Sequence, residues 1–285
     1  MNMNLTQGFT AHWLQWVSTA IELPEPVTEA VLGLLPQLDR PEIIALAGGL
    51  TEPDTAENAC KALCEKLRPD QDGYKILTVH LAALSLLPAR LEKMGLGMDV
   101  FLATARVFTR FVNEHMASFG RYGFDRCWWT WRQTAGLLVR LGVLEFERID
   151  CYSGPEFSGL HREQPVIGLH IPGGSKLTDE GIQASLSRAR ALWPGRPIVC
   201  HSWLLAPALE TLLPEGGIRT LRHVFTPGPA DPSDNSFIQW IFCDTSLAPQ
   251  QWPEDTRLRR AVKAYVLSGG QIGAGWGLVQ QKNGE

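Results

Sequence analysis

The sequence predicts an α+β protein, in which a helical first domain, residues 1–141, is followed by a domain of mixed α/β structure, residues 142–285. Two features support this prediction. From Phe9 to Gly142 the apolar residues recur every three or four positions, as they do in amphipathic helices. After Gly142, short apolar runs of strand length alternate with helical stretches. A chain of 285 residues is long enough to form two domains.

The first domain is expected to consist of helices alone. Trp13 and Trp16 lie on one apolar helix face, and further helices are predicted over residues 54–67, 73–93 and 98–119. The helix with the two tryptophans has no Lys or Arg on its polar side, which favours packing in a bundle over binding to a membrane surface.

A tryptophan-rich run, residues 127–132, begins the last helix of this domain. Trp128 and Trp131 fall on an apolar stripe, which predicts that both are core residues. Trp129 falls on the other side beside Arg132, where it would form an inter-domain contact or part of a ligand-binding wall.

The six cysteines include no CxxC pair, so no disulfide framework is predicted. Cys60 and Cys64 share a helix face and could in principle bind a metal ion. Core packing is the favoured interpretation, because free cysteine behaves as a small buried hydrophobe, and we expect no metal site.

The second domain is organised around residues 165–213. Residues 165–171 and 197–203 are apolar runs of strand length, and Pro172-Gly173-Gly174 ends the first of them. Thr178 is a natural N-cap for the helix between them. Apolar strands joined by a crossover helix imply a buried parallel pair, with polar groups gathered where the strands end.

The remainder of this domain is predicted from shorter patterns. Strands are expected over residues 218–225 and 237–244, on either side of a Pro/Gly/Asp-rich loop over 226–236. A helix over 256–267 and a closing strand over 271–279 complete the chain.

Three glycines, Gly273, Gly275 and Gly277, share one face of the closing strand. They do not form a dinucleotide-binding loop, because Leu278 stands where that pattern needs a glycine. We expect them to permit a close approach of neighbouring backbone.

The predicted ends of the two buried strands hold six residues suited to chemistry, namely His170, Gly173, Gly174, Ser175, His201 and Ser202. The two glycines would let backbone N–H groups approach an anion, and the N-terminus of the next helix adds its positive end. A plain Pro-Gly-Gly turn is the structural alternative.

His201 and Ser202 suggest nucleophilic catalysis, but adjacent strand residues point to opposite faces, so this His does not simply activate this Ser. A hydrolase would instead need His170 within reach of Ser202. A carboxylate of Glu145, Glu147 or Asp150 could accept a proton from an attacking amine, although the solvated face of an edge strand is the favoured interpretation for the two glutamates.

The composition excludes some functional classes. A net charge of −4 argues against a general nucleic-acid binder. The first basic residue is Arg40, so the start lacks the charge of a signal peptide, and no apolar segment is long enough to span a bilayer. We expect a soluble, cytoplasmic protein without nucleic-acid or membrane partners, whose oligomeric state the sequence leaves open.

Several segments resemble a known family. His170-Ile-Pro-Gly-Gly174, the helix with Ser185-Leu186, and Cys200-His-Ser-Trp-Leu-Leu205 resemble the GNAT-like C-terminal domain of bacterial acyltransferase domain-containing proteins. The helical half, with Trp128-Trp129 and Arg132-Gln133, resembles their N-acyltransferase N-terminal domain. The resemblance extends over nearly the whole chain.

This resemblance implies transfer of an acyl group from acyl-CoA or acetyl-CoA to an amine-type small-molecule acceptor. It implies that Gly173, Gly174, Ser175 and Thr178 hold the pyrophosphate at the start of a helix. The backbone near Ile171 would polarise the thioester carbonyl.

The resemblance assigns the proton transfers to the two histidines. His170 or His201 would be the base, and Ser202 would orient the acceptor or the thiol. The alternative is a GNAT-shaped protein without transfer chemistry, which would bind a ligand or a partner.

Overall fold

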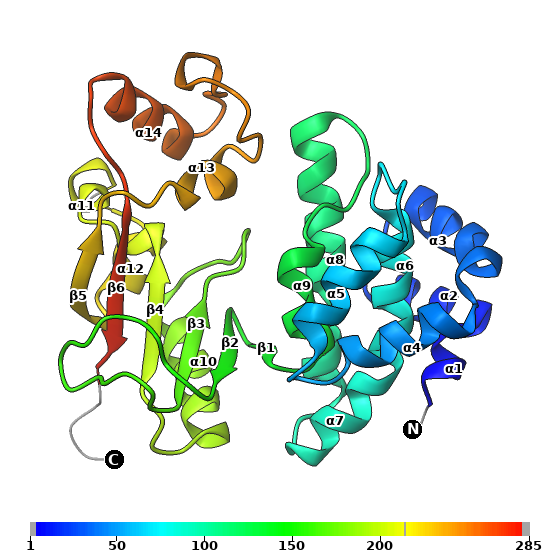
Figure 1. Ribbon diagram of the computed structural model, residues 1–285. Coiled ribbons are helices and arrows are strands. Elements are labelled where there is room, and N and C mark those ends of the chain that lie inside the picture. The colour runs from blue at the N-terminus through cyan, green and yellow to red at the C-terminus, as the bar shows by residue number, and fades with distance from the viewer. Residues whose placement is uncertain (1–3, 214, 281–285) are drawn as a thin grey trace. The chain divides into compact units, whose positions relative to one another are not determined.

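In the computed structural model, residues 4–213 and 215–280 are described, and the chain divides into two compact units, residues 1–140 and 141–285 (Figure 1). The first unit is mainly helical, and a mixed six-stranded sheet, whose first strand crosses the boundary, organises the second, which confirms the predicted fold class.

The first unit is built around α6 (Tyr74–Ala83). Every side chain from Ile76 to Ala83 is buried, because α6 packs against α1, α2, α3, α4 and α9. The other elements of the bundle are α1 (Leu5–Gly8), α2 (Ala11–Ala20), α3 (Glu25–Leu38), α4 (Pro41–Leu50), α5 (Ala56–Lys66), η1 (Leu84–Leu86), α7 (Leu87–Lys93), α8 (Met98–Phe119) and α9 (Cys127–Thr134).

The tryptophan-rich helix is shorter than predicted. α9 ends at Thr134, and residues 138–141 form a strand, so the apolar stripe does not continue along one helix. Trp131 is buried, whereas Trp128, in the first turn, is 43% exposed. The prediction that Trp128 is a core residue was therefore wrong.

The strands of the sheet are β1 (Leu138–Leu141), β2 (Leu144–Ile149), β3 (Val166–His170), β4 (Ile198–Ser202), β5 (Phe225–Asp231) and β6 (Ala274–Val279), in the order β1-β2-β3-β4-β6-β5. β3 and β4 are parallel, and the pairs β2–β3, β4–β6 and β5–β6 are antiparallel. The helical elements are α10 (Asp179–Leu192), η2 (Trp203–Leu205), α11 (Ala208–Leu212), α12 (Gly217–Arg222), α13 (Ser236–Ile241), η3 (Pro249–Gln251) and α14 (Arg257–Leu267).

The predicted strand–helix–strand centre is confirmed. α10 begins after Thr178, whose side-chain oxygen accepts a hydrogen bond from the Gly181 amide at 3.2 Å, and it connects β3 to the parallel β4. The long segment between β2 and β3 crosses one face of the sheet (Figure 1), where Tyr152 and Leu160 pack on Val166 and Val199.

The predictions for residues 218–244 were wrong. α12 and α13 lie where strands were expected, and β5 occupies part of the expected loop. β5 contains Pro227 and Pro229, which are tolerated because β5 is the edge of the sheet and its register with β6 shifts between Pro227 and Ala230.

Among the described residues, no helix combines the length and apolar character needed to cross a membrane.

The glycines of β6 permit the close backbone approach that the sequence predicts. A Cβ atom on Gly275 would lie 2.5 Å from the carbonyl oxygen of Leu205, and one on Gly277 would lie 2.9 Å from Phe225. Because these glycines have no side chain, η2 can lie directly against β6.

We therefore expect Gly275→Ala to destabilise the second unit by about 1–3 kcal/mol, because backbone atoms must move to admit the methyl group. Gly33→Ala is the matched control, since a Cβ there meets nothing within 4 Å and α3 gains helix propensity. Differential scanning calorimetry of both variants measures the effect. An unchanged unfolding transition in Gly275→Ala would contradict the packing described for η2.

Candidate active site at the open ends of β3 and β4

The two parallel strands are paired over a short stretch. Ile167 pairs with Ile198 and Gly168 with Val199, and both strands continue to His170 and Ser202. Each strand stays paired with its outer neighbour over this distance, β3 with β2 as far as His170 and β4 with β6 as far as Ser202. The carboxyl ends of β3 and β4 are therefore no longer paired with each other, but each is still held by its outer neighbour in the sheet.

His170, the last residue of β3, forms a hydrogen bond across the sheet. Its Nε2 lies 2.8 Å from Oε2 of Glu147 on β2, and the two side chains are 25% and 14% exposed. Gly168 lies between them, and a Cβ there would approach the imidazole to 3.4 Å. The carboxylate fixes the orientation of the imidazole.

The interpretation of Glu145 and Glu147 as the solvated face of an edge strand was wrong. β2 lies between β1 and β3 in the sheet, and Glu145 is 2% exposed. Glu147 is largely buried beside His170. Both carboxylates thus lie on the same face of the sheet as His170.

His201 lies on β4 between an aromatic ring and two carboxylates. Its imidazole stacks on Trp276 of β6 at 4.4 Å between ring centroids, and its Nε2 lies 4.0 Å from Oδ2 of Asp234. A carboxylate oxygen of Asp231 belongs to the same cluster, in which the ligand atoms are within 4.8 Å of one another. Asp231 is the last residue of β5 and Asp234 follows it before α13, so the cluster joins β4 to the end of β5.

The two histidines share one face of the sheet. Because Gly168 pairs with Val199, His170 and His201 each lie two residues further along their strands and point to the same side. Beyond the last β3–β4 pair, both imidazoles and their acidic partners lie on this face of the sheet.

Ser202 points to the opposite face from His201. Its Oγ accepts a hydrogen bond from the Leu204 amide at 3.1 Å and caps η2. The structure thus brings His170 together with Glu147, and His201 with Asp234, and it places Ser202 at the start of η2.

The loop after β3 contains the remaining predicted residues. Ile171 leads into a turn in which the Ser175 amide donates to the Pro172 carbonyl at 3.3 Å. Gly173 and Gly174 are exposed, and Gly174 has φ +75°, a backbone conformation that favours glycine. A Cβ on Gly174 would meet nothing within 4 Å, so this side of the loop is open.

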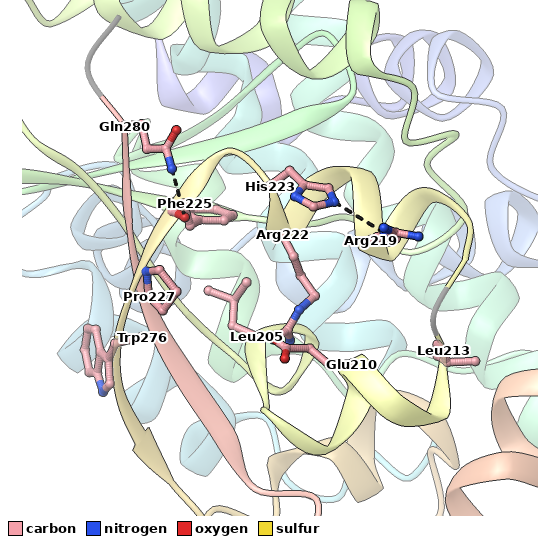
Figure 2. Close-up of a pocket in the computed structure, with 10 residues that line it drawn as sticks. All are labelled: Leu205, Glu210, Leu213, Arg219, Arg222, His223, Phe225, Pro227, Trp276 and Gln280. Carbon is pink, nitrogen blue, oxygen red and sulfur yellow. Dashed lines mark hydrogen bonds and ion pairs between the residues drawn. The ribbon is translucent and has the colours of Figure 1, made fainter.

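A cavity of about 570 Å³ lies beside α12 (Figure 2). Arg219, Arg222 and His223 give it a basic wall, and Leu205 and Phe225 an apolar one. The Arg222 guanidinium donates to the carbonyls of Leu204 and Ala206, and therefore holds η2. α12 begins beside the loop, since a Cβ on Gly217 would lie 2.9 Å from Leu177.

The Cys200 thiol and the Tyr152 hydroxyl could also react, but both side chains are buried in the core of the second unit. Burial raises the pKa of Cys200 to about 12, which keeps this core thiol protonated. Burial also raises the pKa of Tyr152 to about 12, and its hydroxyl donates to the Pro155 carbonyl.

The sequence did not single out Asp231, Asp234 or Trp276 as site residues. Asp231 and Asp234 lie about thirty residues after His201 along the chain, and no local pattern connects them to it. The contact of Trp276 with His201 depends on the antiparallel register of β4 and β6, which no local pattern in the sequence shows.

Comparisons with known proteins match both halves of the chain. The profile of the N-acyltransferase N-terminal domain matches residues 14–136, and that of the GNAT-like C-terminal domain matches residues 138–279. No curated protein sequence matches the chain.

Solved structures share the fold over nearly the whole length. An acyltransferase mutant in complex with octanoyl-CoA has a TM-score of 0.73 at 22% identity, over 94% of this chain and 87% of that one. An acyltransferase in complex with decanoyl-CoA and teicoplanin has a TM-score of 0.63 at 22% identity, over 93% and 98%. One in complex with CoA and 10C-teicoplanin has 0.64 at 20% identity, over 94% and 99%.

With both profiles matched in the expected order, the chain belongs to the acyltransferase family that joins an N-acyltransferase N-terminal domain to a GNAT-like C-terminal domain.

Proposed function

We propose that this protein transfers an acyl group from acyl-CoA to the amine of a small-molecule acceptor. Residues 142–285 would form the transferase domain and residues 1–141 its helical partner. The observation that carries the proposal is the end of the β3–β4 register at Gly168 and Val199, next to a Gly-Gly loop and a helix N-terminus. The similar structures with acyl-CoA or CoA bound support the same choice of co-substrate.

The pantetheine arm would insert between the ends of β3 and β4. An extended chain of amides can hydrogen-bond to facing strands, here to the backbone around Leu169 and Cys200. Trp203 packs away from this opening, in the cluster formed by α11, α13 and α14, whereas Trp276 stacks on His201 at the candidate site.

The pyrophosphate would lie on the loop formed by Gly173, Gly174 and Ser175, against the N-terminus of α10. The backbone amides of this loop and the positive end of α10 favour an anion there, and the exposed Lys176 adds a positive charge. The basic wall of the cavity beside α12, with Arg219 and His223, would take the 3′-phosphate of CoA.

In the transfer step, His170 would remove a proton from the acceptor amine as the amine attacks the thioester carbonyl. Glu147 holds the imidazole for this role and would stabilise the imidazolium. A backbone amide near Ile171 would donate to the developing oxyanion. When the tetrahedral intermediate collapses, the C–S bond breaks, and His201 on the same face, protonated from solvent, would donate a proton to the CoA thiolate, while His170 releases its proton to solvent.

Calorimetric titration with octanoyl-CoA, CoA and dephospho-CoA tests the proposal. We expect micromolar binding of octanoyl-CoA and CoA, roughly −8 kcal/mol, and weaker binding of dephospho-CoA, which lacks the 3′-phosphate. Gly174→Glu should abolish binding, because the new carboxylate blocks and repels the pyrophosphate.

Gly195→Glu is the matched control. Gly195 also has φ +75° and open surroundings, but it precedes β4 at the opposite end of the sheet, beside a second cavity of about 630 Å³. The Gly195→Glu variant should bind octanoyl-CoA as tightly as the unmodified protein does. Loss of binding in Gly195→Glu but not in Gly174→Glu would place the ligand in the second cavity instead. No binding of any CoA species would reject the proposal.

A second prediction concerns the base. His170→Ala should lower kcat about 10²–10⁴-fold with little change in KM for acyl-CoA, and Glu147→Gln should have a smaller effect in the same direction. Release of CoA thiol from octanoyl-CoA in the presence of a panel of primary amines, teicoplanin among them, measures the rate. His161→Ala, at an exposed position in the segment between β2 and β3, is the control. Full activity of His170→Ala would exclude His170 as the base.

A further inference from the structure

Three cysteines converge in the helical unit. Cys60 and Cys64 lie one turn apart on α5, and Cys127 is the first residue of α9, which packs against α5. Their Sγ atoms all lie within 4.8 Å of one another. The Sγ atoms of Cys64 and Cys127 are 3.2 Å apart, and the Cys60 thiol donates to the Cys127 carbonyl at 3.3 Å.

The spacing of the sulfurs suits a single metal ion. Zinc–thiolate bonds are about 2.3 Å long, so three sulfurs around one cation lie about 4 Å from each other. The present separations require shifts of under about 1 Å to reach this geometry, within the reach of a change in χ1. The two helices already direct the three side chains toward one point, so metal binding would cost little conformational entropy.

The environment selects the class of cation. Cys60 is 3% exposed and the other two thiols are half-buried. Three sulfur ligands favour soft ions such as Zn²⁺ and Cu⁺ over Mg²⁺ or Ca²⁺, which prefer oxygen.

We propose that Cys60, Cys64 and Cys127 form a three-thiolate site for one thiophilic d¹⁰ cation, Zn²⁺ or Cu⁺, which links α5 to α9. Binding replaces the thiol protons with three metal–sulfur bonds and changes no oxidation state. The cluster as described contains no histidine or carboxylate ligand, so Zn²⁺ would take a water as its fourth ligand through the half-buried side, whereas Cu⁺ is satisfied by three sulfurs. The site is separate from the proposed transferase chemistry.

The test uses the full chain, reduced and stripped of metal under anaerobic conditions. Cd²⁺ is the spectroscopic probe, because Cd²⁺–thiolate bonds absorb in the near ultraviolet, and competition with chromophoric chelators gives the affinities for Zn²⁺ and Cu⁺. We expect one equivalent of Cd²⁺ per chain to saturate the absorption.

Cys64→Ser and Cys127→Ser should each weaken binding at least tenfold. Cys151→Ser is the control, because Cys151 is an exposed thiol outside the cluster, and it should bind as the unmodified protein does. Circular dichroism verifies that each variant is folded. The absence of the charge-transfer band at one equivalent of Cd²⁺ in the unmodified protein would overturn the proposal, whether or not the variants fold. Equal affinity in Cys64→Ser and the unmodified protein would also overturn it.

Discussion

The short register between β3 and β4 is the constraint on which the candidate site depends. Parallel strands normally continue their hydrogen bonds along their length, but here the mutual pairing covers two residues of each strand. The outer neighbours keep both strands in order beyond it, because β2 pairs with β3 through His170 and β6 pairs with β4 through Ser202. An opening can therefore form inside a sheet without loss of order in the strands that border it.

The same arrangement places the charged groups. Side chains alternate along each strand, so the pairing of Gly168 with Val199 brings His170 and His201 to one face, and the pairing of β2 with β3 brings Glu147 to His170. The capped start of α10 follows on the same loop. The proposed site for a long anionic thioester needs an extended slot, an anion-binding turn and a proton acceptor. His170, the Gly-Gly loop and the start of α10, all within about ten residues of the end of β3, are our candidates for the last two, and β3 and β4 are those for the slot.

Local signals in the sequence were enough to predict the strands, turn and helix at the centre of the second domain. The apolar runs, the Pro-Gly-Gly break and the Thr178 cap each act within a few residues, and the structure has the strands, the turn and the helix there. The features that were missed depend on partners far along the chain. Glu147 seemed solvated because nothing local shows that β2 is flanked on both sides, and the Cys127 thiol joins Cys64 only through the packing of α9 on α5. β5 was missed because its prolines argue against a strand unless its position at the sheet edge is known.

Hydrogen–deuterium exchange with and without octanoyl-CoA tests the central claim most directly, because it locates the ligand without any substitution. If the thioester inserts between β3 and β4, amides of residues 169–178 and 200–204 become protected, together with those of α12 beside the loop. Protection confined to residues 193–198 and 278–280, around the cavity at the opposite end of the sheet, would contradict the account.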